Sequence, residues 1–292
     1  MAQKIPKHIQ GIIQQSKGGQ YKFGQIEMPE LKQGDLLIKV HAAPINPSDI
    51  GFIKGTYPSN DFPTILGKEG SGFVIAGYGE QEQKLIGKKV AFLPKASSRT
   101  GTYADYAIST INSSFILPDD VNLDQFSCVL INPQTVAYMF ETVKENNVKA
   151  VVHDLGASQL GKQMTSYFQA NGVDVINIVR RQDQLEDLKK NGAKYILNQN
   201  DEGFWDKLSE LCQKLQVTIA FDAIGGEFTQ NLINYLPNSS ILYTYGSLAE
   251  KKDVILALLG TVINKFDAFG YQQKYKDRMK KKNKELIKQQ MS

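Results

Sequence analysis

A glycine-containing turn in the middle of the 292-residue chain has the spacing of a phosphate-binding loop. The turn reads HDLGASQLG from residue 153, follows a short apolar run and opens an amphipathic segment. Gly156, Ser158 and Gly161 stand at the three key positions of a degenerate GxGxxG pattern, with Gln159 and Leu160 between the last two. In this pattern the first position allows a tight turn, the second a close backbone approach to a diphosphate, and the third helix–strand packing. The pattern predicts a dinucleotide here, with an ordinary strand–helix turn as the alternative.

Two arginines follow the next apolar run. Arg180 and Arg181 end the segment 175–179, about 20 residues beyond the glycines, where folds that bind NAD place Asp or Glu. An arginine at this position accommodates the 2′-phosphate of NADPH. Asp183 stands close enough in sequence to neutralise one of the two. The pattern favours NADPH over NADH, and the alternative is a pair of solvated loop arginines.

The sequence lacks the residue clusters on which several other chemistries depend. The three histidines, His8, His41 and His153, are far apart, and no HxxxH or CxxC spacing occurs. Cys128 and Cys212 are too few for a disulfide framework or a four-cysteine zinc site. No nucleophile elbow or Walker loop is present. We therefore expect no metal site and a reducing compartment.

The charge is unevenly distributed along the chain. The formal net charge is +4, yet residues 271–292 hold eight basic and two acidic residues, which leaves 26 basic and 28 acidic residues in the rest. We expect a basic helical tail whose segment Lys274 to Lys288 docks on an acidic surface of a protein partner. Nucleic acid is not expected, because no aromatic residues interleave with the charges. No apolar run has the roughly 18 residues of a membrane span, which argues against an integral membrane protein.

The pattern of apolar residues changes near residue 124. Before it, short runs broken by Gly and Pro predict β-strands, at 9–15, 35–41, 71–79, 88–93 and 103–108. After it, strands expected at 150–153, 173–179, 195–197, 217–221 and 241–245 alternate with helices at 160–171, 183–191, 204–215 and 228–236. This predicts an α/β protein with a β-domain over 1–124, a doubly wound parallel sheet over 125–268 and a helical tail over 269–292.

Short motifs spread over roughly residues 5 to 250 resemble those of the medium-chain dehydrogenases/reductases. In the first half they are Asn46–Ile50, Gly55–Pro58, Leu66–Gly72, Gly87–Val90, Gly101–Ala104 and Leu117–Asp119; in the second half, Asp222–Gly226 and Tyr245–Ser247. The resemblance implies a GroES-like β-domain and a Rossmann domain with a cleft between them.

Within that family the chain resembles the zinc-free branch. The zinc enzymes carry Cys where Asn46 or Pro47 stands and His where Lys68 stands, so the resemblance implies no zinc. The segments Ala42–Ile50, Asn132–Thr135 and Ile178–Arg180 are most similar to mitochondrial trans-2-enoyl-thioester reductases, with quinone oxidoreductases as near relatives. Both groups transfer hydride from NADPH to an electron-poor double bond or a quinone.

The resemblance also implies roles for individual residues. Tyr57 corresponds to a proton donor or enolate stabiliser, with a packed loop tyrosine as the alternative. Asn46 corresponds to a residue lining the nicotinamide pocket, or serves only to cap a turn. Thr135 corresponds to a hydroxyl that contacts the cofactor, or is an ordinary residue of a helical first turn. Gly246 corresponds to a residue that binds the cofactor, whereas Asp222 is expected to shape the loop that follows its strand.

Two departures from the family leave a second function open. Gln159 stands beside the expected diphosphate where relatives have Gly or Ala, and its side chain either points away or fills the cofactor's space. Beyond Gly246 we expect the family's closing strands to be missing and replaced by the basic tail. The chain is therefore either an NADPH-dependent oxidoreductase acting on a small enoyl thioester or quinone, or a catalytically silent subunit of a larger assembly that has lost the cofactor. The expected location is mitochondrial or cytoplasmic.

Overall fold

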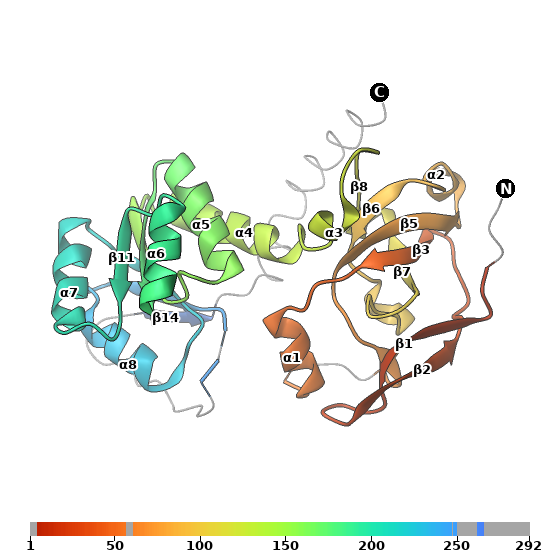
Figure 1. Cartoon of the computed structure of the whole chain (residues 1–292), viewed down its shortest axis with the longest axis horizontal. Helices are drawn as coiled ribbons and strands as arrows, with labels where there is room; N and C mark the ends of the chain where they lie inside the picture. Colours follow the sequence, from red (N-terminus) through yellow and green to blue (C-terminus); the bar gives the residue numbers. More distant parts are fainter. Residues whose placement is uncertain (1–4, 57–60, 247, 250–261, 266–292) are drawn as a thin grey trace. The chain divides into compact units, whose positions relative to one another are not determined.

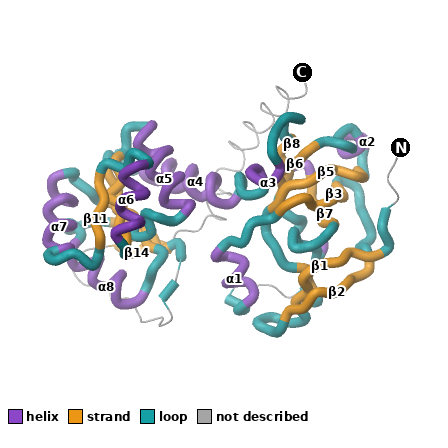
Figure 2. Tube along the Cα trace, in the orientation of Figure 1, coloured by secondary structure: helices purple, strands orange, loops and turns teal. Residues whose placement is uncertain are grey.

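The computed structural model describes residues 5–56, 61–246, 248–249 and 262–265. These residues fall into two compact units, divided between Ile131 and Asn132 (Figure 1). Unit 1 is built mainly from antiparallel strands and unit 2 from alternating strands and helices (Figure 2). The expected α/β class, with a β-domain followed by a doubly wound sheet, is confirmed.

Unit 1 contains two sheets. The larger has the order β7 (Tyr106–Thr110), β3 (Asp35–Ala42), β5 (Gly70–Gly77), β6 (Lys89–Phe92) and β8 (Ser114–Ile116), all antiparallel. The smaller has the order β2 (Tyr21–Glu27), β1 (His8–Gln14) and β4 (Thr64–Ile65). The segments between and after these strands contain short helices: α1 (Pro47–Ile53), α2 (Glu80–Gln83), α3 (Leu123–Phe126) and the 3₁₀ turns Ala96–Ser98 and Ile111–Ser113. Alternate apolar residues of β3, β5 and β6 form the core of the larger sheet, among them Leu36, Ile38, Val74, Val90 and Phe92.

Several parts of unit 1 differ from the sequence-based prediction. The strand expected at 103–108 begins later, because residues 103–105 pair with β1 before the chain enters the larger sheet as β7. In that crossing segment Ile12 N–H donates to the Tyr103 carbonyl at 2.9 Å. Strand β2 was not predicted: it contains Tyr21, Phe23 and Ile26, but Gly24 and Gln25 interrupt their alternation and none of its residues is buried. The short strands β4 and β8 were not predicted either.

Unit 2 is a six-stranded parallel sheet. Its order is β11 (Tyr195–Asn198), β10 (Asp174–Val179), β9 (Ala150–His153), β12 (Ile219–Asp222), β13 (Ile241–Thr244) and β14 (Val262–Lys265). The helices are α4 (Ile131–Glu145), α5 (Gln159–Ala170), α6 (Gln182–Lys190), α7 (Phe204–Lys214) and α8 (Gly226–Tyr235). The predicted elements between 150 and 245 are all present, and this strand order is that of a Rossmann fold.

Helices cover both faces of the parallel sheet. The period of two along each strand sends Val151 to the face packed by α4 and α5, and Val152 to the face packed by α7 and α8 (Figure 1). Phe140 and Phe168 meet edge-on in the first layer, with ring centroids 5.3 Å apart. Because both faces are covered, the strands are continuous apolar runs and the loops at their carboxyl ends are left to bind ligands.

An aromatic cluster joins α7 to α8 in the second layer. Trp205 stacks on Tyr235 with ring centroids 5.1 Å apart, and lies 5.4 Å from the ring of Phe228 and 4.8 Å from that of Phe204. Leu208, Cys212 and Leu232 are fully buried in the same layer. These contacts hold the two helices on one side of the sheet.

Candidate functional site

The loop after β9 lies where the strand order reverses. β9 pairs with β10 on one side and with β12 on the other, so the crossovers leave it in opposite directions. Doubly wound sheets bind ligands at this switch point, outside the carboxyl ends of the strands. The predicted phosphate-binding turn therefore occupies the ligand-binding position of its fold.

Close packing requires both glycines of the turn. The N–H of Gly156 donates to the Ile178 carbonyl at 3.0 Å, and a Cβ on Gly156 would lie 2.7 Å from the Cβ of Asn177 in β10. A Cβ on Gly161 would collide with the carbonyl oxygens of Leu155 and Gly156. Gly161 thus allows the helix to pack on the turn, as the pattern predicts, whereas Gly156 makes room for the neighbouring strand.

The first turn of α5 keeps two backbone donors free. Ser158 is the N-cap, and its hydroxyl oxygen accepts the N–H of Gly161 at 2.9 Å. The N–H groups of Gln159 and Leu160 donate no hydrogen bond to any residue that the structure describes. Two free donors at the positive end of a 12-residue helix suit a phosphate group.

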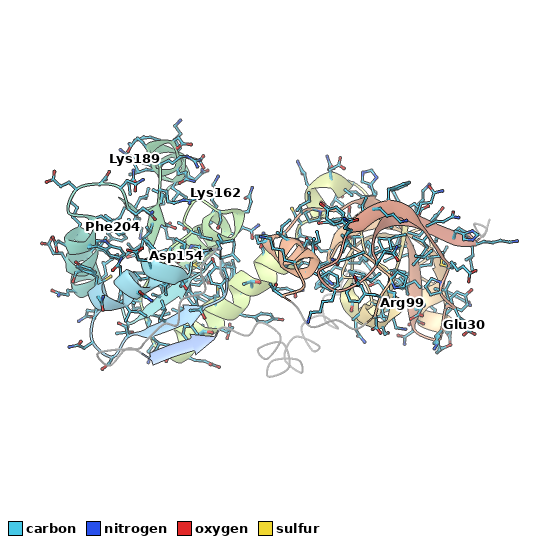
Figure 3. The ribbon with its side chains drawn as sticks, turned by 90° about the horizontal axis from the view of Figure 1, so that it is seen from below. Glu30, Arg99, Asp154, Lys162, Lys189 and Phe204 are labelled. Carbon is cyan, nitrogen blue, oxygen red and sulfur yellow. The ribbon has the colours of Figure 1, made fainter. Side chains whose placement is uncertain are left out.

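Gln159 is the departure from the family pattern at this helix end. It is the first residue of α5 and its side chain is exposed. Farther along the helix, Lys162 forms an ion pair with Asp187 of α6, with Nζ and Oδ2 2.5 Å apart, and Figure 3 shows its side chain extending from the ribbon. The exposed side chain of Gln159 is compatible with both expectations, pointing away from a cofactor or filling its space.

The two arginines after β10 differ in their partners. The guanidinium of Arg181 forms two hydrogen bonds with the carboxylate of Asp183, at 2.9 and 3.1 Å, so Asp183 does neutralise one arginine. The backbone of Arg180 is fixed at both ends: its N–H donates to the Gln184 side chain at 3.1 Å, and its carbonyl accepts from Asn200 at 2.7 Å. Its exposed guanidinium has no partner in the described part of the chain. Arg180 is thus the arginine available to a phosphate.

A buried histidine ends β9. His153 is 0% exposed, and its Nε2 lies 2.6 Å from the hydroxyl oxygen of Tyr245, which follows β13. The rings stack with an interplanar angle of 24°. Burial lowers the pKa of His153 to about 3, so the imidazole is neutral at physiological pH. The pairing with Tyr245 was not predicted from the sequence.

Two buried aspartates shape the neighbouring loops. Asp154 accepts the N–H groups of Ala223 at 3.0 Å and of Ile224 at 3.2 Å, and Figure 3 places it within the body of unit 2. Asp222 accepts the Gly225 N–H at 3.1 Å and the Thr229 hydroxyl at 2.6 Å, so it shapes its loop as predicted. Burial, followed by the hydrogen bond and charge of Asp222, raises the pKa of Asp154 well above its usual range.

A second group of buried polar residues lies in unit 1. Asn46 begins α1; its backbone N–H donates to Asp49 Oδ2 at 2.8 Å and its side-chain amide donates to Glu69 Oε1 at 2.9 Å. The other oxygen of Glu69 accepts the N–H groups of Leu130 and Ile131 at 3.1 and 3.0 Å. Asn46 therefore has a structural role at the start of α1. Burial raises the pKa of both Asp49 and Glu69.

For the remaining predicted site residues, the structure gives a location or no description at all. Thr135 lies half-buried in α4, and a Cβ on the exposed Gly246 would lie 2.8 Å from the Cβ of Ala223. Tyr57 and the segment Lys274 to Lys288 lie outside the described residues. Among the described residues, no three His, Cys, Asp or Glu side chains are placed to share a metal ion, and no helix is long and apolar enough to cross a membrane.

Family models match both halves of the chain. Residues 32–119 match the alcohol dehydrogenase GroES-like domain, and residues 160–280 match a family described as zinc-binding dehydrogenase. Among curated proteins, the mitochondrial enoyl-[acyl-carrier-protein] reductase of Rattus norvegicus is 27% identical, with 84% of this chain and 68% of that protein covered. The Homo sapiens enzyme of the same name is 26% identical, with 97% and 78% covered.

Solved structures match along most of the chain. The putative NADPH:quinone reductase of Mesorhizobium loti superposes with a TM-score of 0.85 at 30% identity, covering 97% of this chain and 88% of that one. The Escherichia coli quinone oxidoreductase complexed with NADPH superposes with a TM-score of 0.74 at 16% identity, covering 90% and 82%, and so shares the fold.

Proposed function

The chain belongs to the medium-chain dehydrogenase/reductase family, and on that premise we propose that it is an NADPH-dependent reductase of electron-poor acceptors. The acceptor that we favour is an α,β-unsaturated thioester, with quinones as the second acceptor class. The observation that carries this proposal is that two helix N-terminal N–H groups without a partner and an arginine without a partner, directly after the next strand, occur together among the described residues.

The described residues fit NADPH. The free N–H groups of Gln159 and Leu160 would hold the diphosphate, and the guanidinium of Arg180 would hold the 2′-phosphate. When bound, the cofactor supplies the hydride. The role of the chain is to orient the cofactor at the switch point of the sheet and to keep the neighbouring buried groups fixed. Asn46, Thr135, Ser158, Arg181 and Gly246 remain proposed cofactor contacts, and Tyr57 a proposed proton donor.

The named relatives support the choice of acceptor. The rat and human relatives are named for the reduction of enoyl groups on acyl-carrier protein, and they align with most of this chain. The Mesorhizobium loti structure is named as a putative NADPH:quinone reductase. The first name describes reduction of an enoyl group and the second reduction of a quinone, and both acceptors are electron-poor conjugated carbonyl compounds of the class that we assign to this protein.

Cofactor binding and turnover test the proposal separately. We expect NADPH fluorescence to change on titration with the protein, and NADPH to be oxidised when crotonyl thioester is added. Parallel assays with benzoquinone distinguish the two acceptor classes. Absence of NADPH binding at millimolar concentration would show that the proposal is wrong and would favour a catalytically silent subunit.

The cellular setting is also a proposal. Relatives named as mitochondrial support a mitochondrial location, and cell fractionation tests it against a cytoplasmic one. A protein partner for the basic segment Lys274 to Lys288 remains a prediction from the sequence, which co-purification with and without that segment would test.

A further inference from the structure

Lys68 in unit 1 lies in a tightly packed turn between β4 and β5. The preceding residue, Gly67, has φ +97°, and a Cβ there would lie 2.7 Å from the Tyr103 nitrogen and would collide with the Thr102 hydroxyl. A side chain at position 67 is therefore excluded by both conformation and space. The backbone that presents Lys68 is held by this packing.

The ammonium group of Lys68 has free hydrogen-bond donors. Its Nζ lies 3.7 Å from the centroid of the Phe52 ring, and Phe52 is only 8% exposed. In the described part of the chain the ammonium donates no hydrogen bond and forms no ion pair. Burial lowers the pKa of Lys68, and the charge of Asp49 raises it in part. A half-buried ammonium with unfilled donors is a binding group for an oxygen that carries negative charge.

The neighbouring polar groups are largely occupied. Both oxygens of Glu69 accept hydrogen bonds, and Oδ2 of Asp49 accepts the backbone N–H of Asn46. The Tyr103 hydroxyl donates to the Pro44 carbonyl at 3.0 Å, and burial together with the nearby carboxyl groups holds its pKa above the usual value. Asp49 is 2% exposed and its second oxygen, Oδ1, has no partner among the described residues. Within this cluster, Lys68 is the group that can still donate to a ligand.

The segment that contains Phe52 also carries exposed apolar side chains. Ile45, just before α1, is 76% exposed, and Ile50 within α1 is 44% exposed. Large apolar side chains in solvent next to a partly desolvated polar cluster suit a substrate with an apolar body and a polar head.

We propose that Lys68 is a catalytic residue whose ammonium binds the carbonyl oxygen of the α,β-unsaturated acceptor. This inference rests on the proposed function. When bound, NADPH would supply the hydride to the β-carbon. The Cα=Cβ electron pair would then form a double bond between the α-carbon and the carbonyl carbon, and the C=O pair would move to the oxygen. Lys68 stabilises the resulting enolate oxygen. Water would then protonate the α-carbon, which restores the carbonyl group.

The test compares three variants. Lys68→Met removes the charge at similar length, Lys68→Arg retains it, and Lys54→Met is a matched control, since Lys54 is exposed at the end of α1. We expect Lys68→Met to lower kcat by about 10²-fold, the loss typical for one oxyanion donor. NADPH affinity should change little, Lys68→Arg should regain part of the rate, and Lys54→Met should match the unmodified protein.

A measurement without cofactor provides an independent readout. A cinnamoyl thioester changes its absorbance maximum when its carbonyl is polarised, so we expect a red shift on binding that Lys68→Met abolishes and Lys54→Met keeps. Circular dichroism and thermal unfolding verify that the variants fold, and Lys68→Gln replaces Lys68→Met if the latter does not.

The outcomes separate the two proposals. If the unmodified protein reduces the thioester and Lys68→Met retains both the rate and the red shift, the role of Lys68 is wrong while the proposed function stands. If the unmodified protein binds NADPH but reduces no acceptor, the proposed function is wrong. A red shift that still depends on Lys68 would then support carbonyl binding by this residue alone.

Discussion

The imidazole of His153 and the hydroxyl of Tyr245 join the ends of two strands that are not adjacent in the sheet. Nε2 and the hydroxyl oxygen are 2.6 Å apart, while Nδ1 of the same ring has no partner among the described residues. With one ring nitrogen already unpaired, the imidazole depends on Tyr245 for its remaining hydrogen bond. This dependence makes the pair a sensitive point in unit 2.

Removing the hydroxyl of Tyr245 should destabilise unit 2. Tyr245→Phe keeps the stacked ring but leaves a fully buried imidazole without a hydrogen bond, at a cost of about 1–3 kcal/mol. Urea unfolding should show a lower midpoint at an unchanged slope. Tyr167→Phe is the control, because Tyr167 is 45% exposed. Equal midpoints for the two variants would contradict the prediction.

The buried imidazole should also make the fold sensitive to acid. The pKa of His153 is about 3 in the folded protein, against an ordinary value of 6.5, so below pH 6.5 the unfolded chain binds the extra proton. Its contribution to stability is complete above pH 6.5 and is lost between 6.5 and about 3, at up to about 1.4 kcal/mol per pH unit. Thermal unfolding at a series of pH values measures this slope. His153→Gln should reduce it, whereas His8→Gln, at an exposed position, should not.

Replacing Asp154 by its neutral isostere should be tolerated. The raised pKa of Asp154 favours the protonated carboxyl in the folded state, so its contribution to stability falls as the pH rises above the ordinary value of 3.8. Asp154→Asn removes that penalty and should gain stability relative to the unmodified protein as the pH increases. Asp154→Ala instead leaves the N–H groups of Ala223 and Ile224 unpaired and should cost about 1–3 kcal/mol. A large loss in Asp154→Asn at neutral pH would show that the carboxyl is ionised.

The two arginines after β10 should differ in their effect on cofactor affinity. Arg180→Gln removes an unpartnered guanidinium and should weaken NADPH binding by about 10- to 100-fold, with NADH binding nearly unchanged. Arg181→Gln should have a smaller effect, because Arg181 is already bonded to Asp183. Fluorescence titration gives the four dissociation constants. A larger loss in Arg181→Gln than in Arg180→Gln would reverse the assignment.

Gln159 should prove dispensable for binding. Its side chain is exposed at the first position of α5, so Gln159→Ala is expected to leave the Kd for NADPH within about twofold. Ser158→Ala serves for comparison, since loss of the N-cap costs about 1 kcal/mol of stability. A strong gain of affinity in Gln159→Ala would mean that this side chain occupies the cofactor's space.

The strands and helices of unit 2 could be predicted because they depend on the local pattern of apolar residues. The apolar runs around His153, Val179 and Phe221 each alternate with an amphipathic helix, and that repetition defines the Rossmann sheet without any knowledge of contacts. Its glycine pattern also identified the first turn correctly. By contrast, the apolar side chains of Tyr21 and Phe23 in β2 are exposed and their alternation stops at Gly24, so this strand was missed.

Contacts between distant segments could not be predicted from the sequence. The packing of Gly156 on Asn177 depends on which strand lies beside the turn, and the bond from His153 to Tyr245 spans 92 positions. The contact of Lys68 with Phe52 could not be predicted either. The sequence showed only that Lys68 stands where the zinc enzymes have His, and its position over the Phe52 ring became evident in three dimensions.

The aromatic cluster of α7 and α8 gives this protein a built-in optical probe. Trp205 is the single tryptophan of the chain, and its ring stacks on Tyr235 in unit 2. Emission excited selectively from indole therefore originates in the Rossmann unit, while far-ultraviolet circular dichroism averages over both. Recorded together during denaturation, the two signals reveal whether the β-domain and the Rossmann unit melt in a single step or one after the other.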